Sequence, residues 1–170
     1  MAAPPPDRVD RIVAEWERER PDLDVGAQQL IGRLHRLAEA LTTRLVPVYE
    51  AHGLGEGEFD VLCALRRAGA PYERQPAELA RTTMITTGAA TKRIDRLQAA
   101  GLVMRVRRPS DDGRAVRVRL TARGRRLIDQ AFADHVANEE RLVSALGPRD
   151  RQTLERILRT WLSDLAGDEA

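Results

Sequence analysis

The stretch that decides the fold is RRPSDDGRAVRVRLT, residues 107–121, in which turn-forming residues separate two arginine-rich flanks. Residues 103–107 alternate apolar residues with arginine before the turn, and residues 115–120 do the same after it. Alternation with a period of two predicts β-strands, and the Pro, Ser, Asp and Gly residues between them predict a tight turn. We therefore expect a β-hairpin with one apolar face, packed on helices, and one basic face.

The positive charge of this hairpin needs a negatively charged partner, because Arg107, Arg108 and Arg114 lie close together around its turn. Like charges that face each other across a hairpin are unfavourable unless something neutralises them. Residues 74–126 hold 14 Lys and Arg against 4 Asp and Glu, whereas the rest of this chain of net charge +2 holds 14 against 22. A solvated basic surface is the plain reading of such a count. The local excess, opposed by an acidic remainder, favours a polyanion and above all nucleic acid.

The stretch before the hairpin, QPAELARTTMITTGAATKRIDRLQAAGLV at residues 75–103, predicts a helix, a turn and a second helix. Thr86 or Thr87 can cap the second helix, and Ala90, Ile94 and Leu97 place one of its faces against the core. The opposite face is small and polar, which suits a helix that enters a major groove beside a wing. The predicted DNA contacts are Thr86, Thr87, Gly88, Thr91, Lys92, Arg96, Arg107, Arg108 and Arg114.

Long helices with apolar stripes flank this region on both sides. In a chain of 170 residues such stripes are most simply covered by a second copy, so we expect residues 7–52 and 122–166 to form a homodimer interface. The predicted fold is mainly α with a small β-hairpin wing, a winged helix-turn-helix. We divide it into N-terminal helices at 1–53, a DNA-binding lobe at 54–120 and C-terminal dimerisation helices at 121–170.

The sequence contains no motif that indicates catalysis, metal binding or cofactor binding. It contains no nucleophile elbow, zinc-protease, phosphate-loop or dinucleotide motif, so we expect no enzymatic activity and no cofactor. His35, His52 and His135 are too scattered for a metal site, and the single cysteine, Cys63, excludes an intrachain disulfide. No apolar run reaches the roughly 18 residues of a membrane span, and the first residues lack the order of a signal peptide, so we expect a cytoplasmic protein.

The run RIDRLQAAGLV at residues 93–103, the hairpin after it and LTARG at residues 120–124 together resemble the MarR family. The resemblance extends over nearly the whole chain. Members are winged-helix, homodimeric transcription regulators of bacteria, so it implies that fold and double-stranded DNA as a partner. In the family an Asp and the Arg two residues later organise the wing and its DNA contact, and these correspond to Asp112 and Arg114. Gly113 stands between them where the family often has an arginine.

A narrower resemblance concerns the N-terminal helix with its tryptophan, FDVLCALRRAGAPY at residues 59–72 and TTGAATKRIDRL at residues 86–97. These parts are similar to the urate-responsive branch of the family. In that branch a Trp, an Asp and two Arg form the effector site, which implies a ligand site made of Trp16, Asp60, Arg93 and Arg105. The helical positions agree in part, because Arg93 lies beside the buried stripe of its helix and Asp60 is a suitable partner for it.

The expected function is that of a ligand-responsive transcriptional repressor, which binds a pseudo-palindromic operator as a homodimer and is released by a small anion such as urate. Three alternatives remain open. The winged helix could be a protein-interaction module, which predicts no salt-dependent DNA binding. The four ligand-site residues could form a salt-bridge cluster and a core aromatic without a ligand. Cys63 could sense oxidants, although its place four residues after Phe59 on an apolar face favours a buried, unreactive thiol.

Overall fold

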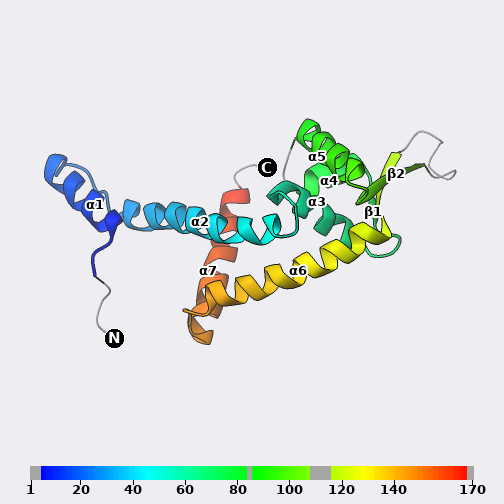
Figure 1. Ribbon diagram of the computed structural model, residues 1–170. Coiled ribbons are helices and arrows are strands. Elements are labelled where there is room, and N and C mark those ends of the chain that lie inside the picture. Colours follow the sequence, from blue (N-terminus) through cyan, green and yellow to red (C-terminus); the bar gives the residue numbers. More distant parts are fainter. Residues whose placement is uncertain (1–4, 84–85, 108–115, 168–170) are drawn as a thin grey trace. The chain divides into compact units, whose positions relative to one another are not determined.

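The computed structural model describes residues 5–83, 86–107 and 116–167, and it is mainly helical with a small antiparallel sheet (Figure 1). The elements follow in the order α1 (Arg8–Glu19), α2 (Ala27–Glu50), α3 (Glu56–Arg67), β1 (Glu73–Arg74), α4 (Pro76–Thr82), α5 (Thr87–Ala99), β2 (Val103–Arg107), β3 (Val116–Leu120), α6 (Ala122–Val143) and α7 (Pro148–Gly167). This order confirms the predicted fold class. The chain divides into two compact units, one ending at Arg44 and the other beginning at Leu45, and each is described by itself.

The first unit joins α1 to the beginning of α2. Asp7 caps α1 by accepting a hydrogen bond from the backbone N–H of Asp10 at 3.0 Å, and the side chain of Asp10 accepts one from the N–H of Asp7 at 2.8 Å. Arg33 of α2 then binds both carboxylates, with Nε 2.9 Å from Asp7 and Nη2 2.7 Å from Asp10. Val9 and Val13 are buried, whereas Ile12 and Trp16 on the same apolar stripe are exposed, so the apolar face of α1 is covered only in part within the unit.

The second unit holds the main core, with α3 at its centre. The side chains with less than 2% of their surface exposed come from α3, α4, α5, β2, β3 and α6, and they include Val61, Leu62, Leu65, Leu79, Ile94, Leu97, Val118 and Ile128. Fully burying one such side chain stabilises the fold by roughly 1.5–3 kcal/mol. The apolar positions that the sequence predicts for the second helix of the helix-turn-helix, α5, are therefore buried as expected.

The sheet has the order β1-β3-β2, and both of its pairings are antiparallel. Val103 pairs with Leu120 and Arg107 with Val116, so the two strands of the predicted hairpin are confirmed. The turn between them, residues 108–115, lies outside the described residues. β1 was not predicted, because a strand of two residues is too short to show any periodicity.

Local signals for helix ends agree with the structure. Thr86 caps α5 by accepting a hydrogen bond from the N–H of Ala89 at 3.2 Å, and Thr121 caps α6 in the same way. Helix α2 continues through Pro47 to Glu50, so this proline does not end the helix.

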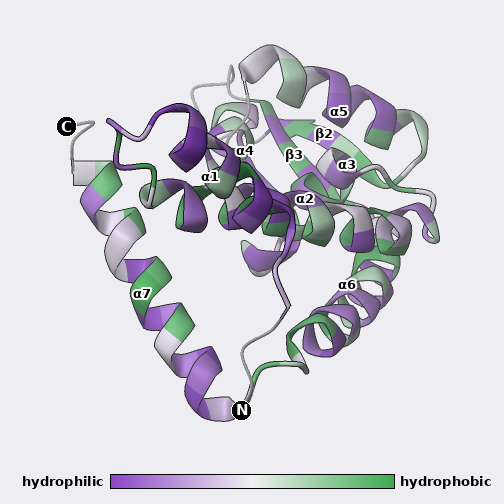
Figure 2. Cartoon of the chain, turned by 90° about the vertical axis from the view of Figure 1, so that its left-hand side faces the viewer, coloured by the Kyte–Doolittle hydropathy of each residue, from purple (hydrophilic) through white to green (hydrophobic). Residues whose placement is uncertain are grey.

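Several helices leave large apolar side chains exposed. No residue of α7 is buried, and apolar positions recur along it (Figure 2). The exposed apolar residues of α6 and α7 are Phe132, Val136, Leu154, Ile157, Leu162 and Leu165. A helix whose apolar stripe has no cover in its own chain needs one from outside.

The start of α6 lies very close to Leu102, which precedes β2. A Cβ added at Gly124 would overlap the carbonyl oxygen of Leu102 and lie 2.9 Å from the carbonyl carbon. Thr121 donates hydrogen bonds to the same carbonyl, from its backbone N–H at 3.0 Å and from its hydroxyl at 3.1 Å. A glycine at position 124 is what allows the two backbones to approach this closely.

We expect Gly124→Ala to lower the free energy of unfolding by roughly 1–3 kcal/mol, because the new methyl group meets rigid backbone rather than a movable side chain. Urea unfolding at a fixed protein concentration measures this. Gly88→Ala is the matched control, since nothing lies within 4 Å of a Cβ at this helical glycine. Equal unfolding midpoints for parent and Gly124→Ala would contradict the prediction.

Candidate DNA-binding surface and effector pocket

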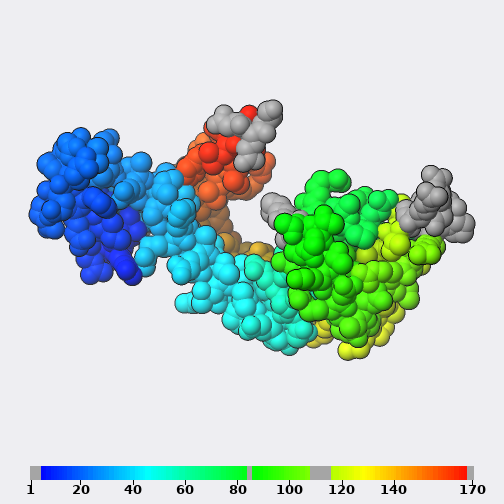
Figure 3. Space-filling view, turned by 90° about the horizontal axis from the view of Figure 1, so that it is seen from above, coloured from blue at the N-terminus to red at the C-terminus, as the bar shows by residue number. Residues whose placement is uncertain are grey.

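Helix α5, the recognition helix, presents one face to solvent (Figure 3). Its opposite face buries Ala90, Ile94 and Leu97, which orients the polar face outward. On that polar face the hydroxyl of Thr91 donates to the carbonyl of Thr87 at 3.0 Å, so this side chain is held in place. All of the predicted DNA contacts on this helix are exposed: Thr86, Thr87, Gly88, Thr91, Lys92 and Arg96.

Arg96 is the one predicted contact on the recognition helix that holds an ion pair in the part of the chain that the structure describes. Its Nε and Nη2 atoms each lie 2.6 Å from Oε1 of Glu58, in the first turn of α3. The Glu58 side chain is 16% exposed and that of Arg96 is 63% exposed. Arg96 therefore fixes α5 against α3, and part of its charge is already neutralised by Glu58.

The arginines of β2 have different surroundings. Arg105 donates to Gln98 and to Asp95, both at 2.6 Å, and so connects the hairpin to the recognition helix. It does not line the pocket that contains Asp60. Arg107 is exposed at the end of β2. The remaining predicted wing residues, which lie outside the described residues, are Arg108, Asp112 and Arg114.

The basic face of the hairpin has a neutralising partner within the chain, which the sequence did not reveal. Glu73 of β1 forms ion pairs with two arginines of β3. Nη2 of Arg119 lies 2.7 Å from Oε2 of Glu73, and Nε of Arg117 lies 4.0 Å from Oε1. The Glu73 side chain is almost wholly buried. We expected this face to need an external anion. For Arg117 and Arg119 that expectation is wrong, because β1 pairs with β3 and so places the Glu73 carboxylate beside both arginines.

Asp60 lines a pocket in the second unit. Its volume is about 270 Å³, and its walls come from α3, the end of α4 and α6. The lining residues are Phe59, Asp60, Cys63, Arg67, Thr82, Thr83, Phe132 and His135. Sequence reasoning missed Arg67 and His135. The spacing of Asp60, Cys63 and Arg67 at i, i+3 and i+7 places them on one helical face and could have revealed the first of these.

The pocket contains a half-buried carboxyl group and an unsatisfied polar atom. Burial raises the pKa of Asp60, and Glu56 raises it further, while Arg93, Arg67 and His135 act in the opposite direction. Among the described residues, the Nδ1 atom of His135 is buried without a hydrogen-bond partner. Groups with perturbed pKa values and unsatisfied polar atoms are more frequent at functional sites than elsewhere.

Cys63 lies in the wall of the same pocket. Burial raises the pKa of its thiol to about 12, with a further contribution from Asp60. A thiol with so high a pKa is almost entirely protonated at neutral pH and is a poor nucleophile. The raised pKa therefore favours the protonated, weakly nucleophilic form of the Cys63 thiol.

Arg93, predicted as a ligand-binding residue, lies against the first turn of α3. Its guanidinium occupies the space beside Gly57, where a Cβ would overlap the Cζ and Nε atoms of Arg93. It also lowers the pKa of Asp60 electrostatically. In the described part of the chain the two residues form no direct ion pair, so Arg93 lies near Asp60 without contacting its carboxylate.

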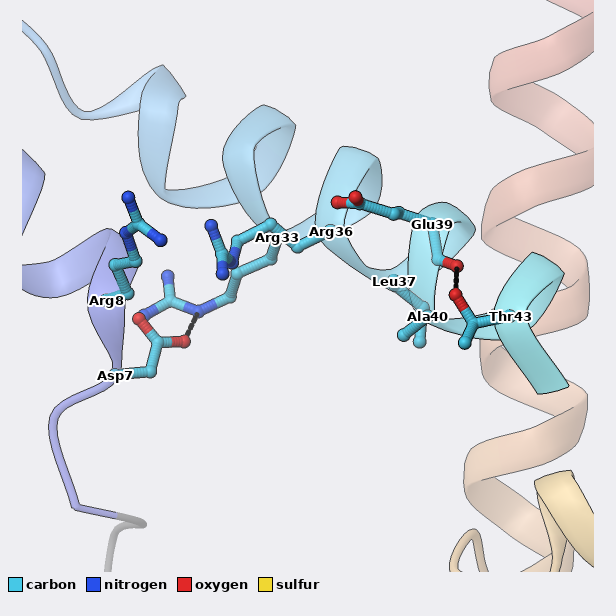
Figure 4. A pocket seen from close by; sticks show the side chains of 8 residues that line it. All are labelled: Asp7, Arg8, Arg33, Arg36, Leu37, Glu39, Ala40 and Thr43. Atoms are coloured by element: carbon cyan, nitrogen blue, oxygen red, sulfur yellow. Dashed lines mark hydrogen bonds and ion pairs between the residues drawn. The ribbon is translucent and has the colours of Figure 1, made fainter.

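The fourth predicted ligand residue, Trp16, belongs to the first unit, where 47% of its surface is exposed. That unit has a more open hollow of about 580 Å³ of its own (Figure 4). Trp16 does not line it. Asp7 is bound there by Arg33, and the hydroxyl of Thr43 donates to the carbonyl of Glu39 at 2.9 Å. The lining residues are Asp7, Arg8, Arg33, Arg36, Leu37, Glu39, Ala40 and Thr43.

Residues 5–83, 86–107 and 116–167 offer neither a metal site nor a membrane span. No group of three or more His, Cys, Asp or Glu side chains in these ranges is arranged to hold a metal ion. No helix within them is long and apolar enough to cross a membrane.

Comparison with known proteins identifies the family. Residues 52–115 match the MarR family. The chain is 37% identical over 151 residues to the HTH-type transcriptional regulator PecS of Dickeya dadantii, covering 88% of this chain and 90% of that protein. Its fold is similar to AbsC, a MarR family regulator from Streptomyces coelicolor, with a TM-score of 0.74, 25% identity and coverage of 85% and 98%. It is also similar to a mutant MarR from E. coli complexed with operator DNA, with a TM-score of 0.69, 28% identity and coverage of 82% and 99%.

The match to PecS extends over most of both chains, and the recognition helix and hairpin described above lie within the matched segment. The chain belongs to the MarR family of winged-helix transcriptional regulators.

Proposed function

We propose that the protein is a homodimeric repressor, which binds a pseudo-palindromic operator and is released when a small, planar anion such as urate occupies the pocket at Asp60. The observation that carries this proposal is the double role of α3. Its first turn binds the recognition helix through Glu58 and Arg96, and its next turns line the pocket. An occupant of the pocket therefore acts on the same helix that holds the DNA-reading element.

Dimerisation is supported by the exposed apolar stripes. Leu162 is 66% exposed and Ile157 is 46% exposed, and α7 buries none of its residues in its own chain. A two-fold dimer built from residues 7–52 and 122–166 would cover these stripes and set the distance between two DNA-binding lobes at 54–120. Family membership supports the same assembly.

We expect light scattering at micromolar concentration to give twice the 19.0 kDa chain mass. Leu162→Arg places a charge in the proposed interface and should shift the protein toward monomer. Arg159→Ala on the same helix is the matched control and should remain dimeric, since Arg159 is 78% exposed and, among the described residues, pairs with its helical neighbour Glu155. A parent protein that is monomeric in this range would contradict the assembly.

DNA binding is proposed for the exposed face of α5 and the wing. Lys92 is exposed there beside small residues that permit close approach to base edges. Two-fold symmetry places the two recognition helices in successive major grooves, with half-sites about 10 base pairs apart. The wing residues Arg107, Arg108, Asp112 and Arg114 are proposed to contact the adjacent minor groove and backbone, as the family resemblance implies.

Lys92→Ala should weaken binding to DNA from upstream of the protein's own gene. It should also reduce the slope of log K against log salt by about 1.8, because one phosphate contact is lost in each subunit of the proposed dimer and each contact contributes about 0.9. Mobility-shift titrations at several salt concentrations measure both quantities. Arg18→Ala is the control, as a 70% exposed arginine of α1 outside the lobe. Binding that does not depend on salt would instead favour the protein-interaction alternative.

The proposed effector is small, planar and anionic because of the chemistry of the pocket. A volume of about 270 Å³ is just below the range of roughly 300–1,000 Å³ that holds drug-sized molecules. Phe59, Phe132 and His135 offer ring faces for stacking, and Arg67 offers a cationic partner. The unpaired Nδ1 of His135 offers a hydrogen bond. Trp16, Arg93 and Arg105 are proposed as further members only from the resemblance to the urate-responsive branch.

Release follows from competition between charges. In the free protein the Arg93 guanidinium lies within electrostatic reach of Asp60. An anion that enters the pocket offers Arg93 and Arg67 another partner and repels the Asp60 carboxylate, which loosens the position of α5 on α3. To weaken DNA binding tenfold, the anion must favour the loosened state by about 1.4 kcal/mol, which is within reach of one charge-assisted hydrogen bond.

We expect Arg67→Ala to weaken the release of DNA by urate about tenfold, because the anion loses its cationic partner. Arg66→Ala is the matched control, since the neighbouring arginine binds Asp129 and does not line the pocket. The measurement is a urate titration of the preformed DNA complex.

The same titration on Asp60→Asn and Trp16→Phe tests the rest of the site. Asp60→Asn should fold well, because a buried carboxyl with a raised pKa destabilises the folded chain when it is ionised above that pKa, and the amide removes this cost at neutral pH. Identical titrations in the parent and all of these variants would leave the four predicted residues as structural elements only.

A further inference from the structure

Gly57 is the second residue of α3, and the guanidinium of Arg93 lies against it. A Cβ at this position would overlap two atoms of that group and lie 2.5 Å from Nη1. Any residue other than glycine would therefore displace the guanidinium. Glycine is unfavourable within a helix compared with alanine, so its presence calls for a reason, and the contact with Arg93 supplies one.

The contact belongs to a pair of links between the same two helices. Arg93 and Arg96 are three residues apart on α5 and so lie on one face of it. They meet consecutive residues of α3, because Arg93 lies on Gly57 while Arg96 binds Glu58 at 2.6 Å. Two arginines, one turn apart on the recognition helix, therefore hold the first turn of α3.

The same turn of α3 leads to the pocket. Asp60 follows Gly57 by three residues and lies on the same face of the helix. Its carboxyl interacts electrostatically with Arg93 and also lines the pocket of about 270 Å³. Arg93 therefore belongs to the recognition helix α5, while its guanidinium lies beside Gly57 and close enough to the pocket to act electrostatically on Asp60.

We propose that Gly57 is a positioning residue: its missing side chain provides a seat for the guanidinium of Arg93, and this seat couples the pocket at Asp60 to the recognition helix. The inference rests on the proposed function, since it assigns the route by which an occupant of the pocket acts on DNA binding. It adds a residue that touches neither DNA nor the pocket.

Gly57→Ala is a clean test, because the atoms that would overlap the new methyl group are the far end of a flexible side chain. The variant should unfold cooperatively like the parent, with the guanidinium moved away from its seat. NMR titration of the Asp60 carboxyl should then give a higher pKa than in the parent, because a nearby positive charge has been withdrawn. The other charged groups that act on this carboxyl, Glu56, Arg67 and His135, are unchanged in both proteins.

Gly167→Ala is the matched control, since a Cβ there meets nothing within 4 Å, and it should leave the Asp60 titration as in the parent. An Asp60 pKa that is unchanged or lowered in Gly57→Ala would contradict the proposal that Gly57 holds the Arg93 guanidinium near Asp60. This measurement needs neither DNA nor an effector, so it tests whether Gly57 positions Arg93 even if the proposed function is wrong.

Coupling is tested by a double-mutant cycle on DNA affinity. Asp60→Asn removes the pocket charge and should change the Kd for DNA about tenfold in the parent background, a typical strength for coupling between sites. In the Gly57→Ala background the same substitution should change the Kd by less than about twofold, because the route is interrupted. In the Gly167→Ala background the tenfold change should remain.

An equal effect of Asp60→Asn in all backgrounds, or no effect in the parent, would overturn the coupling. Failure of urate to release the DNA would concern only the proposed effector, since the cycle contains no ligand. A parent protein that binds no DNA would overturn the proposed function and the coupling together.

Discussion

A DNA-recognition helix must expose one face to solvent while its opposite face packs firmly against the rest of the fold. In this protein a narrow apolar stripe on α5 provides that packing. Ala90, Ile94 and Leu97 are almost completely buried, and each larger side chain contributes roughly 1.5–3 kcal/mol to the fold. The polar links to α3 and β2 contribute far less, because exposed ion pairs are worth about 0–1 kcal/mol. The apolar stripe therefore supplies stability, while the links through Arg96 and Arg105 set the orientation.

This division makes the orientation of α5 adjustable at small energetic cost. Helix α3 is the common element, because its apolar face lies in the core, its first turn receives two arginines and its remaining polar face lines the pocket. Asp60 is an unfavourable charge in that position, since burial raises its pKa. Titratable groups with perturbed pKa values are more frequent at functional sites than elsewhere, which is consistent with the proposed role of the pocket.

The parts of this structure that sequence could predict depend on neighbours along the chain. Thr86 and Thr121 act as caps through bonds that span three residues, and strand alternation in the hairpin is equally local. The partners of the arginines depend on contacts across the fold. Glu58 lies 38 residues from Arg96, and Glu73 lies 46 residues from Arg119 in a strand too short to recognise. The charge count therefore showed where arginines are concentrated, but it could not distinguish those paired within the chain, such as Arg96 and Arg119, from those that stay exposed, such as Arg107.

The surroundings of Cys63 give the protein a built-in chemical reporter. It is the single thiol of the chain, it lines the pocket, and burial raises its pKa to about 12. A maleimide or iodoacetamide reagent needs an accessible thiolate, so the folded chain resists labelling, whereas an unfolded or opened chain exposes a thiol of ordinary reactivity. The labelling rate therefore reports how often the surroundings of Cys63 open, without any added fluorophore or engineered residue.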